Sequence, residues 1–485
     1  FYGMDTLQIL EKNPYMLIED IPGIGFISAD KIAIRMGFGK ESEFRVQSGI
    51  LYLLKTLAAN FGHTSYPQLN LIEEAAVLLE VGKEFVEDQL SVLILRGKLK
   101  LIEDGSIFFI ALPYYFNLEK GAALKLKELL SIQEQNSSFS YRDKNSKIKL
   151  NDNQIQAIEA AVNLNFSIIT GGPGTGKTTI LSSIISILKD KKVALCAPTG
   201  RAAKRMQETT GTDAFTIHKL LEYGQDENLF NRNSDNLLEY EVIIVDEVSM
   251  VDIALFYHLL SAIPMGSKLV LIGDSDQLPS VGAGNILVDL IQSELFHVTR
   301  LTDIYRQKED SQIIINSIHI KHGEMPILNA EKGNFYYIPE NNAAKTADII
   351  VDLVLERIPK YKKLSDTDSI LKSIQVLSPM KKGTCGTIEL NQRIQNRLIQ
   401  NKREELVYAG ISYYPGDKII QIKNDYNIEY EDITTKLKYK GLFNGEIGII
   451  LGIRDGIAQI LFDDSKIVHY SSANFENVSL AYCLT

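Results

Sequence analysis

The sequence has few cysteines and no long hydrophobic run. Its three cysteines, Cys196, Cys385 and Cys483, lie far apart and form no CxxC pair. This spacing excludes a disulfide framework and a cysteine-rich zinc site, and it is typical of proteins in a reducing, cytoplasmic compartment. No apolar segment is long enough to span a bilayer, and the first residues show no signal-peptide pattern. We therefore expect a cytoplasmic globular protein.

The chain also lacks an excess of positive charge. With 61 acidic and 51 basic residues, its formal net charge is −10. Proteins that coat nucleic acid without selectivity are usually basic, so a nucleic-acid partner would need a local basic groove. The 485 residues exceed one ordinary hydrophobic core, and 45% hydrophobic with 23% charged residues is a soluble globular balance. Several domains are expected.

A glycine-rich segment, "IITGGPGTGKTTIL" at 168–181, predicts a nucleoside triphosphate site. An apolar strand over 166–170 precedes glycines that let backbone N–H groups turn onto phosphate oxygens. Lys177 can reach the outer phosphates, the Thr178 hydroxyl can bind Mg²⁺, and a helix over 178–190 would direct its positive end at the anion. A glycine-rich loop also arises by chance, but the order of strand, loop and helix favours the phosphate site. The expected nucleotide-binding residues of the loop are Gly172, Pro173, Gly174, Thr175, Gly176, Lys177, Thr178 and Thr179.

A second segment, "VIIVDEVSM", predicts the carboxylates that such a site requires. Residues 242–245 form a fully apolar strand, as in the centre of a parallel sheet. Asp246 then emerges at the carboxyl end of the strand, where open α/β sheets bind ligands. We assign Asp246 to Mg²⁺ and Glu247 to the attacking water. An Asp-Glu pair alone would be typical of a solvated strand end, but after a phosphate loop it predicts this chemistry.

Two further residues are candidates for the terminal phosphate. In "KLVLIGDSDQLPS", Gln277 follows a third strand, and its amide could contact both the phosphate and the water. In "LTDIYRQ", Arg306 could stabilise transition-state charge from a second domain. The alternatives are a polar loop residue for Gln277 and a surface arginine for Arg306.

The ordered set of motifs resembles a known family. No "NKxD" segment favours a GTPase, and no transporter signature favours a pump. The order is phosphate loop, "APTGRAAKR", "TIHKLL", "VDEVSM", "GDSDQLPSVGAGNIL", "DIYRQ", "SPMKKGTCGTIELNQRIQ" and "FNGEIG". From about residue 150 to the end, this set is similar to the RecD-like DNA helicases of superfamily 1B, relatives of the exodeoxyribonuclease V alpha chain.

The resemblance implies an α/β protein with two RecA-like P-loop domains, each with a parallel sheet, and with ATP and Mg²⁺ bound in the cleft between them. It implies 5′→3′ movement along single-stranded DNA, unwinding at single-strand/duplex junctions, and a role in DNA repair or recombination. A monomer that meets single-stranded-DNA-binding or other repair proteins fits this family.

The resemblance implies roles for individual residues, according to their positions in the family's motifs. Gln154 in "LNDNQIQAI" resembles the adenine-reading glutamine of the family. Hydroxyls, backbone N–H groups and cations after strand ends can hold phosphates without reading sequence. A solvated surface charge is the alternative for each lysine. The residues that resemble DNA-contacting motifs are Thr199, Gly200, Arg201, Lys204, Thr216, His218, Lys381 and Lys382.

Between "TIHKLLEYG" and "VIIVDE", the polar segment "QDENLFNRNSDNLLEY" has turn chemistry. In the family, a hairpin at this place, here about 223–240, splits the duplex. Leu229 and Phe230 are the candidate pin residues, and an ordinary surface loop is the alternative.

The front of the chain points to DNA independently. "NPYMLIEDIPGIGFISADKIA" resembles a helix-hairpin-helix in which Pro22, Gly23 and Gly25 shape the hairpin, with Ile21, Ile24 and Ala29 packed beneath it. Backbone N–H groups at such a hairpin contact a DNA phosphate and need few charges. A helix–helix turn that only packs against a neighbour is the alternative. This long extension resembles the stand-alone RecD-like helicases.

These patterns predict a domain order. The expected segments are a helix-hairpin-helix region over 1–62, a winged-helix-like unit over 63–130, a polar linker over 131–149, a first RecA-like domain over 150–296, and a second over 297–485 with an SH3-like β insert over about 416–475.

Two departures from the family leave questions about activity. The "HKSQG"-like motif that would follow "SLAYCLT" is not present, and the chain starts inside the N-terminal region. We expect a fragment of a longer helicase, truncated at both ends, that binds nucleotide but hydrolyses it poorly. No nuclease constellation is evident. The rival hypotheses are a DNA-binding ATP switch or clamp that does not unwind, which would need no pin, and a non-catalytic scaffold.

Overall fold

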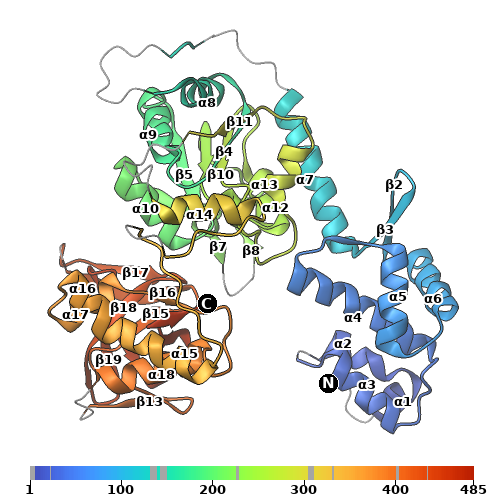
Figure 1. Cartoon of the computed structure of the whole chain (residues 1–485). Helices are drawn as coiled ribbons and strands as arrows, with labels where there is room; N and C mark the ends of the chain where they lie inside the picture. The colour runs from blue at the N-terminus through green and yellow to red at the C-terminus, as the bar shows by residue number, and fades with distance from the viewer. Residues whose placement is uncertain are drawn as a thin grey trace. The chain divides into compact units, whose positions relative to one another are not determined.

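The computed structural model describes residues 6–21, 23–131, 139–141, 150–224, 229–303, 311–329, 333–399, 404–433 and 435–485. The chain divides into two compact units (Figure 1). The first comprises Phe1–Pro198 and Arg205–Gln307, and the second comprises Thr199–Lys204 and Lys308–Thr485. Within the described residues, no helix is both long and apolar enough to cross a membrane.

The first unit begins with a helical region that contains the expected hairpin. Its elements are α1 (Thr6–Lys12), η2 (Pro14–Met16), α2 (Leu17–Asp20), α3 (Phe26–Arg35) and α4 (Glu43–Phe61). The hairpin lies between α2 and α3, where Gly23 has φ +91° and Gly25 caps α3. Ala29 is fully buried beneath it and Ile24 packs against the same core, as the sequence predicts.

A small α/β region follows. Its elements are β1 (Ser65–Pro67), α5 (Gln68–Leu79), α6 (Lys83–Leu95), β2 (Lys100–Asp104), β3 (Ile107–Ala111) and α7 (Pro113–Ser131). The three strands form an antiparallel sheet in the order β1-β3-β2. Helix α7 then leaves this region. Its apolar residues Leu118, Ala122, Leu126 and Leu129 join the core of the six-stranded sheet described next, and a Cβ at Gly121 would overlap Tyr257 of α12 (Ile253–Ala262).

The glycine-rich segment belongs to a six-stranded parallel sheet in the order β11-β4-β10-β9-β5-β6. The strands are β4 (Phe166–Gly171), β5 (Val193–Ala197), β6 (Ala214–Thr216), β9 (Val242–Val245), β10 (Lys268–Gly273) and β11 (Val298–Leu301). The helices are α8 (Asp152–Asn163), α9 (Lys177–Ile187), α10 (Gly200–Thr210), α11 (Ile217–Leu220), α12 (Ile253–Ala262) and α13 (Ile286–Gln292), with η3 (Val248–Met250) after β9.

The central strand β9 shows why the sheet forms. Ile243 and Val245 pack into the core that contains α7, α11, α12 and α13, whereas Val242 and Ile244 pack into the core that contains α8, α9 and α10. Successive side chains of a strand point to opposite faces, so an all-apolar strand needs helices on both sides. The expected apolar strand over 242–245 is confirmed.

Strand β11 corrects the expected domain boundary. It pairs in parallel with β4, Val298 opposite Ile168. The first sheet therefore extends past residue 296, where the sequence placed the boundary. The partner of a short strand is not encoded in its own residues, because pairing depends on which sheet edge is free. Two linker residues, Phe139 and Tyr141, also pack against the core around α8.

The second unit combines helices with a large antiparallel sheet. Its helical elements are α14 (Gln312–Lys321), α15 (Ala343–Asp352), η4 (Leu353–Arg357), α16 (Ile358–Lys362), α17 (Thr367–Ser373), α18 (Thr387–Leu398) and η5 (Ser472–Asn477). In the described residues its parallel sheet has two strands, β12 (Val376–Leu377) and β22 (Cys483–Leu484).

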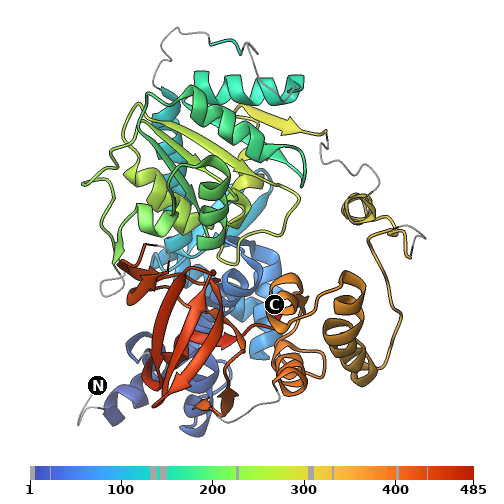
Figure 2. The same ribbon diagram turned by 90° about the vertical axis from the view of Figure 1, so that its left-hand side faces the viewer.

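The antiparallel sheet has the order β17-β16-β20-β19-β18-β15-β21 and is strongly twisted (Figure 2). Its strands are β15 (Lys418–Gln421), β16 (Asp425–Asp432), β17 (Lys438–Leu442), β18 (Ile447–Arg454), β19 (Ile457–Phe462), β20 (Lys466–Ser471) and β21 (Val478–Leu480), and β13 (Leu406–Tyr408) pairs separately with β14 (Ile411–Tyr413). The buried Asp417 carboxylate joins this region to α18, because it accepts from Gln395 Nε2 at 2.6 Å and from the Tyr482 hydroxyl at 2.7 Å.

A buried ion pair should decide the stability of the N-terminal helices. The Arg45 guanidinium donates to both carboxylate oxygens of Asp30, at 2.8 and 3.1 Å, and to the Leu79 carbonyl at 2.7 Å. The Tyr15 hydroxyl donates to the same carboxylate at 2.6 Å. Replacing Arg45 by Met leaves Asp30 without its countercharge, which destabilises by about 3 kcal/mol.

We therefore expect amide hydrogen exchange in α3 and α4 of Arg45→Met to accelerate by about 100-fold relative to the unchanged chain. An Arg35→Met variant, at the exposed end of α3, is the control and should leave exchange unchanged. Equal exchange in Arg45→Met and the control would contradict this role of the pair.

Candidate nucleotide-binding and nucleic-acid site

The glycine-rich loop between β4 and α9 has the geometry of a phosphate cradle. Gly174 and Gly176 adopt φ values of +83° and +88°, which side chains rarely tolerate. Thr175 is buried, and its hydroxyl donates to the Gly172 carbonyl at 2.9 Å, which closes the loop. Lys177 starts α9 and its Nζ donates to the Gly171 and Gly172 carbonyls. A cation and a helix N-terminus thus face the same loop.

Gln154 holds this loop from the side. Its side chain is buried, and Nε2 donates to the Thr175 carbonyl at 3.2 Å. Its Oε1 accepts from the Asn151 N–H at 3.1 Å, in a reciprocal cap at the start of α8. A Cβ at Gly176 would overlap the Gln154 amide, so glycine is required there. The adenine-reading role of Gln154 remains a prediction, and the structure gives it a second role in shaping the loop.

Asp246 and Glu247 follow β9, as the sequence predicts. The Asp246 carboxylate accepts from the Glu247 N–H at 2.9 Å. Burial raises the pKa of Asp246, although that hydrogen bond and the charges of Lys177 and Arg205 oppose the shift. Arg205, on α10, was not among the predicted residues; its only sequence signal is its position four residues after Arg201.

Glu247 has two unusual features. Its backbone is left-handed, with φ +55° and ψ +42°, a conformation that stores strain in a residue other than glycine. Its Oε2 is buried and has no hydrogen-bond partner within the described part of the chain. Buried carboxylate oxygens are rarely left without a partner. Such an oxygen is suited to accept from a water molecule.

The loop after β10 is tied to the strand that precedes the cradle. The Ser275 N–H donates to Thr170 Oγ1 at 3.2 Å, and Asp274 is buried and accepts from the Asp276 N–H at 3.1 Å. These contacts fix the base of the loop. Gln277 lies beyond them, with its side chain exposed to solvent.

The oxygen ligands present are compatible with Mg²⁺. The Thr178 side chain is exposed in the first turn of α9, and the Asp246 carboxylate lies at the same edge of the sheet. Mg²⁺ prefers such hard oxygen ligands and commonly shares them with substrate phosphates. In the described ranges no three His, Cys, Asp or Glu side chains are grouped to hold a metal by themselves. The two residues would therefore hold Mg²⁺ together with a nucleotide.

The DNA-contacting residues predicted between positions 199 and 218 fall into two classes. Arg201 and Lys204 are exposed, and the Thr199 hydroxyl accepts from the Ala202 N–H at 3.2 Å just before them. Gly200 begins α10. Thr216 and His218 instead have internal partners.

The Thr216 hydroxyl is buried and caps α11 by accepting from the Lys219 N–H at 3.1 Å. The His218 ring packs against Tyr223 and Phe230, with ring centroids 5.5 and 5.8 Å apart, and burial lowers its pKa. DNA contacts by these two residues remain predictions.

The remaining predicted residues lie elsewhere. Lys381 and Lys382 are exposed in the loop before α18, in the second unit. Gly23 and Gly25 present open backbone at the N-terminal hairpin, with no atom within 4 Å of an added Cβ. Pro22 and Arg306 lie outside the described residues. The structure thus brings together Lys177, Thr178, Asp246 and Glu247 on the sheet edge of the first unit.

The raised pKa of Asp246 predicts that its carboxylate lowers the stability of the fold while it serves the hydrolysis of ATP. A carboxylate whose folded pKa lies above its unfolded pKa destabilises the fold once both states are ionised, and this penalty disappears as the pH falls through the raised pKa. At neutral pH, Asp246→Asn should therefore melt at a higher temperature than the unchanged chain without nucleotide, and its ATP hydrolysis should fall by roughly 100-fold or more.

Calorimetry and a hydrolysis assay check both halves. Asp190→Asn, which removes an exposed carboxylate after α9, is the control and should change neither quantity. A lower melting temperature in Asp246→Asn would show that the carboxylate supports the fold, contrary to the direction of its pKa shift.

Three family models match separate parts of the chain. Residues 1–65 match the ATP-dependent RecD2 DNA helicase HHH domain, residues 154–283 match an AAA domain, and residues 390–463 match the ATP-dependent RecD-like DNA helicase SH3 domain. The matches to 1–65 and 154–283 contain the N-terminal hairpin and the cradle described above.

Curated relatives extend these matches. The ATP-dependent RecD2 DNA helicase of Deinococcus radiodurans is 30% identical over 500 residues, covering 100% of this chain and 65% of the relative. The RecBCD enzyme subunit RecD of Mycolicibacterium smegmatis is 28% identical over 64% of this chain and 59% of the relative. The chain thus spans less than two thirds of the length of either relative.

A solved structure titled as Bacteroides Pif1 bound to ssDNA is 19% identical, with a TM-score of 0.39 over 70% of this chain and 83% of that chain. This likeness is too weak to bear on function. The RecD2 and RecD-like domain models lie on both sides of the AAA match, and a RecD2 helicase aligns with the whole chain; the chain is thus similar to the RecD-like DNA helicases along its full length.

Proposed function

We propose that this protein is an ATP-dependent DNA helicase that moves 5′→3′ along single-stranded DNA and separates duplex at single-strand junctions. Similarity to RecD-like DNA helicases along the whole chain supports the class of activity. The observation that carries the proposal is the buried, unpartnered Glu247 oxygen beside Asp246, at the edge of the sheet that also holds the cradle. Strained backbone and an unsatisfied carboxylate at one residue are typical of a catalytic position.

The residues divide the chemistry of ATP hydrolysis between them. Lys177 would exchange its carbonyl contacts for phosphate oxygens and balance their charge. Thr178 and Asp246 would hold Mg²⁺, which supplies charge neutralisation at the phosphates. Glu247 would accept a proton from the attacking water through its free oxygen. Gln277 would contact the same water, and Arg306 of the second RecA-like domain would complete the site.

The proposed DNA contacts need only a few charged side chains. The open backbone at Gly23 and Gly25 can donate N–H groups to a phosphate, and Arg201, Lys381 and Lys382 offer exposed cations. Lys204 would exchange its ion pair with Asp463, now 2.9 Å away, for a phosphate. These groups bind backbone rather than bases, so binding should be independent of sequence and sensitive to salt. The names of the relatives, RecD2 DNA helicase and RecBCD enzyme subunit, support a role in repair or recombination in the cytoplasm.

Hydrolysis and unwinding assays test the proposal together. We expect single-stranded DNA to raise the slow ATP hydrolysis that the sequence predicts for this chain, and Lys177→Ala to abolish that increase because phosphate charge is no longer balanced. A duplex with a 5′ tail should be separated, and one with a 3′ tail should not.

The control is Lys189→Ala, which removes an exposed lysine after α9 and should leave both rates unchanged. Stimulated hydrolysis without separation of either duplex would favour the alternative, an ATP-driven DNA switch or clamp. An absence of stimulation by DNA would contradict both.

A further inference from the structure

The β7–β8 pair cannot hold its own position. Strand β7 (Tyr223–Gly224) pairs antiparallel with β8 (Leu229–Phe230), and the ladder has two residue pairs within the part of the chain that the structure describes. Isolated two-stranded pairs are marginal in water even when longer. The orientation of this pair therefore depends on contacts outside its own ladder.

One face of the pair is anchored in the core. The Phe230 ring packs on His258 of α12 at a centroid distance of 4.6 Å and on Tyr223 at 4.9 Å. Leu229 points the opposite way and is 59% exposed. This corrects the expectation that both residues form a pin, because alternation along the strand turns Phe230 inward and makes it an anchor. Leu229 remains the candidate on the exposed face.

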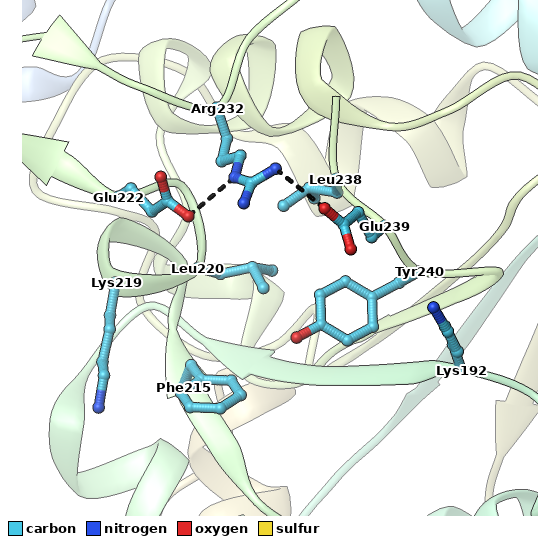
Figure 3. A pocket seen from close by; sticks show the side chains of 9 residues that line it. All are labelled: Lys192, Phe215, Lys219, Leu220, Glu222, Arg232, Leu238, Glu239 and Tyr240. Atoms are coloured by element: carbon cyan, nitrogen blue, oxygen red, sulfur yellow. Dashed lines mark hydrogen bonds and ion pairs between the residues drawn. The ribbon is translucent and has the colours of Figure 1, made fainter. Parts of the chain in front are cut away.

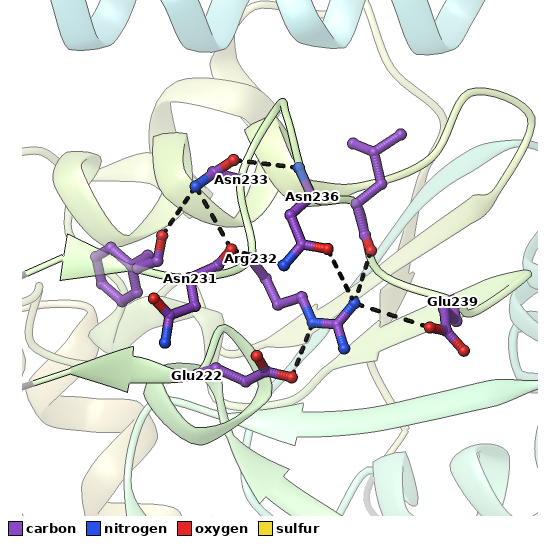
Figure 4. Close-up of polar contacts among 8 residues, drawn as sticks. Glu222, Asn231, Arg232, Asn233, Asn236 and Glu239 are labelled. Atoms are coloured by element: carbon purple, nitrogen blue, oxygen red, sulfur yellow. Dashed lines mark hydrogen bonds and ion pairs between the residues drawn. The ribbon is translucent and has the colours of Figure 1, made fainter.

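Arg232 anchors the other side. It lies in the segment 231–240 that returns from β8 to the sheet, and its Nε donates to Glu222 Oε1 at 2.8 Å, directly before β7 (Figure 4). Its Nη1 donates to the Leu237 carbonyl at 3.0 Å and lies 3.9 Å from Glu239 Oε1. One guanidinium thus joins the residue that enters the pair to the segment that leaves it.

The backbone on both sides of the Arg232 contacts is strained or sharply turned. Glu222 has φ +53°, in the left-handed region. Beyond Arg232, the Asn233 side chain accepts from the Asp235 N–H at 2.9 Å and donates to the Phe230 carbonyl at 3.0 Å, which closes a tight turn. A single exposed ion pair contributes little, but a planar fork with several acceptors also fixes direction.

A cavity behind the guanidinium makes the position of the return segment depend on these polar contacts. A space of about 400 Å³ lies between the return segment and the β6–α11 edge (Figure 3). Arg232 and Glu222 are among the residues that line it, with Phe215, Lys219 and Tyr240 on the other sides. Close-packed side chains would hold the segment by shape, whereas an open cavity lets it move inward when the polar contacts are lost.

We propose that Arg232 is a positioning residue that sets the direction in which the β7–β8 pair projects, and that strand separation depends on it while ATP hydrolysis does not. The predicted effect on strand separation rests on the proposed helicase function. Arg232 makes its contacts within the hairpin and its return segment, so its loss leaves the cradle and the Asp246–Glu247 pair intact.

The test compares unwinding of a 5′-tailed duplex with hydrolysis stimulated by single-stranded DNA. Arg232→Met should lower the unwinding rate by about tenfold or more and leave stimulated hydrolysis unchanged, since small misplacements of a working group have effects of this size. Arg232→Lys keeps the charge but cannot bridge Glu222 and Leu237. Its unwinding rate should therefore lie between those of Arg232→Met and the unchanged chain. Glu222→Gln should weaken unwinding in the same direction.

The matched control is Arg393→Met. It removes an arginine of α18 that has two carboxylate partners, Glu389 of the same helix at 2.7 Å and Asp348 of α15 at 2.9 Å. It should change neither rate. Equal losses of hydrolysis and unwinding in Arg232→Met would overturn the inference, because they would indicate general damage to the fold. Unchanged unwinding would overturn it as well.

Hydrogen exchange separates this inference from the proposed function. In Arg232→Met, amides of 229–240 should exchange about tenfold faster, while α8 and α9 are unchanged. If the unchanged chain does not unwind DNA, the proposed function fails, and exchange alone then decides whether Arg232 holds the pair. Exchange that is the same in Arg232→Met and the unchanged chain would overturn the inference irrespective of unwinding.

Discussion

The burial of β9 on both faces is the constraint on which the candidate site depends. Its four residues are apolar because each must pack against helices, two against each side of the sheet. The first residue free of that demand is Asp246, at the carboxyl end, and Glu247 follows it. Because β4 runs parallel in the same sheet, its carboxyl end brings the glycine-rich loop to the same edge. Burial of one strand thereby sets the place where charged chemistry begins.

Much of the fold could be predicted where the pattern is local. The cradle, the strand before Asp246 and the hairpin at Gly23 and Gly25 each lie within a dozen residues, and each adopts the expected conformation. The errors concern long-range partners. Pairing of β11 with β4 and docking of α7 on α12 depend on segments more than 100 residues away. Nothing in the short strand at 298–301 identifies the sheet edge that it completes.

The predicted site shows a related ambiguity between ligand and scaffold. Hydroxyl, amide and imidazole side chains can bind a phosphate or satisfy a neighbouring backbone group. Thr216 caps a helix, Gln154 closes the cradle, and His218 packs among aromatic rings. The residue type alone does not distinguish these uses. The left-handed backbone of Glu247 could not be predicted either, because its local sequence contains no glycine or asparagine that would indicate it.

Helix α7 gives the N-terminal region a rigid connection to the parallel sheet that carries the cradle. Its 19 residues extend for about 28 Å as one helix, from the end of β3 to the sheet that carries the cradle. Leu118, Ala122, Leu126 and Leu129 fasten its length to that core, and Gly121 allows close approach to Tyr257. A force on the small antiparallel sheet is therefore transmitted along one continuous helix and is not absorbed by a flexible linker.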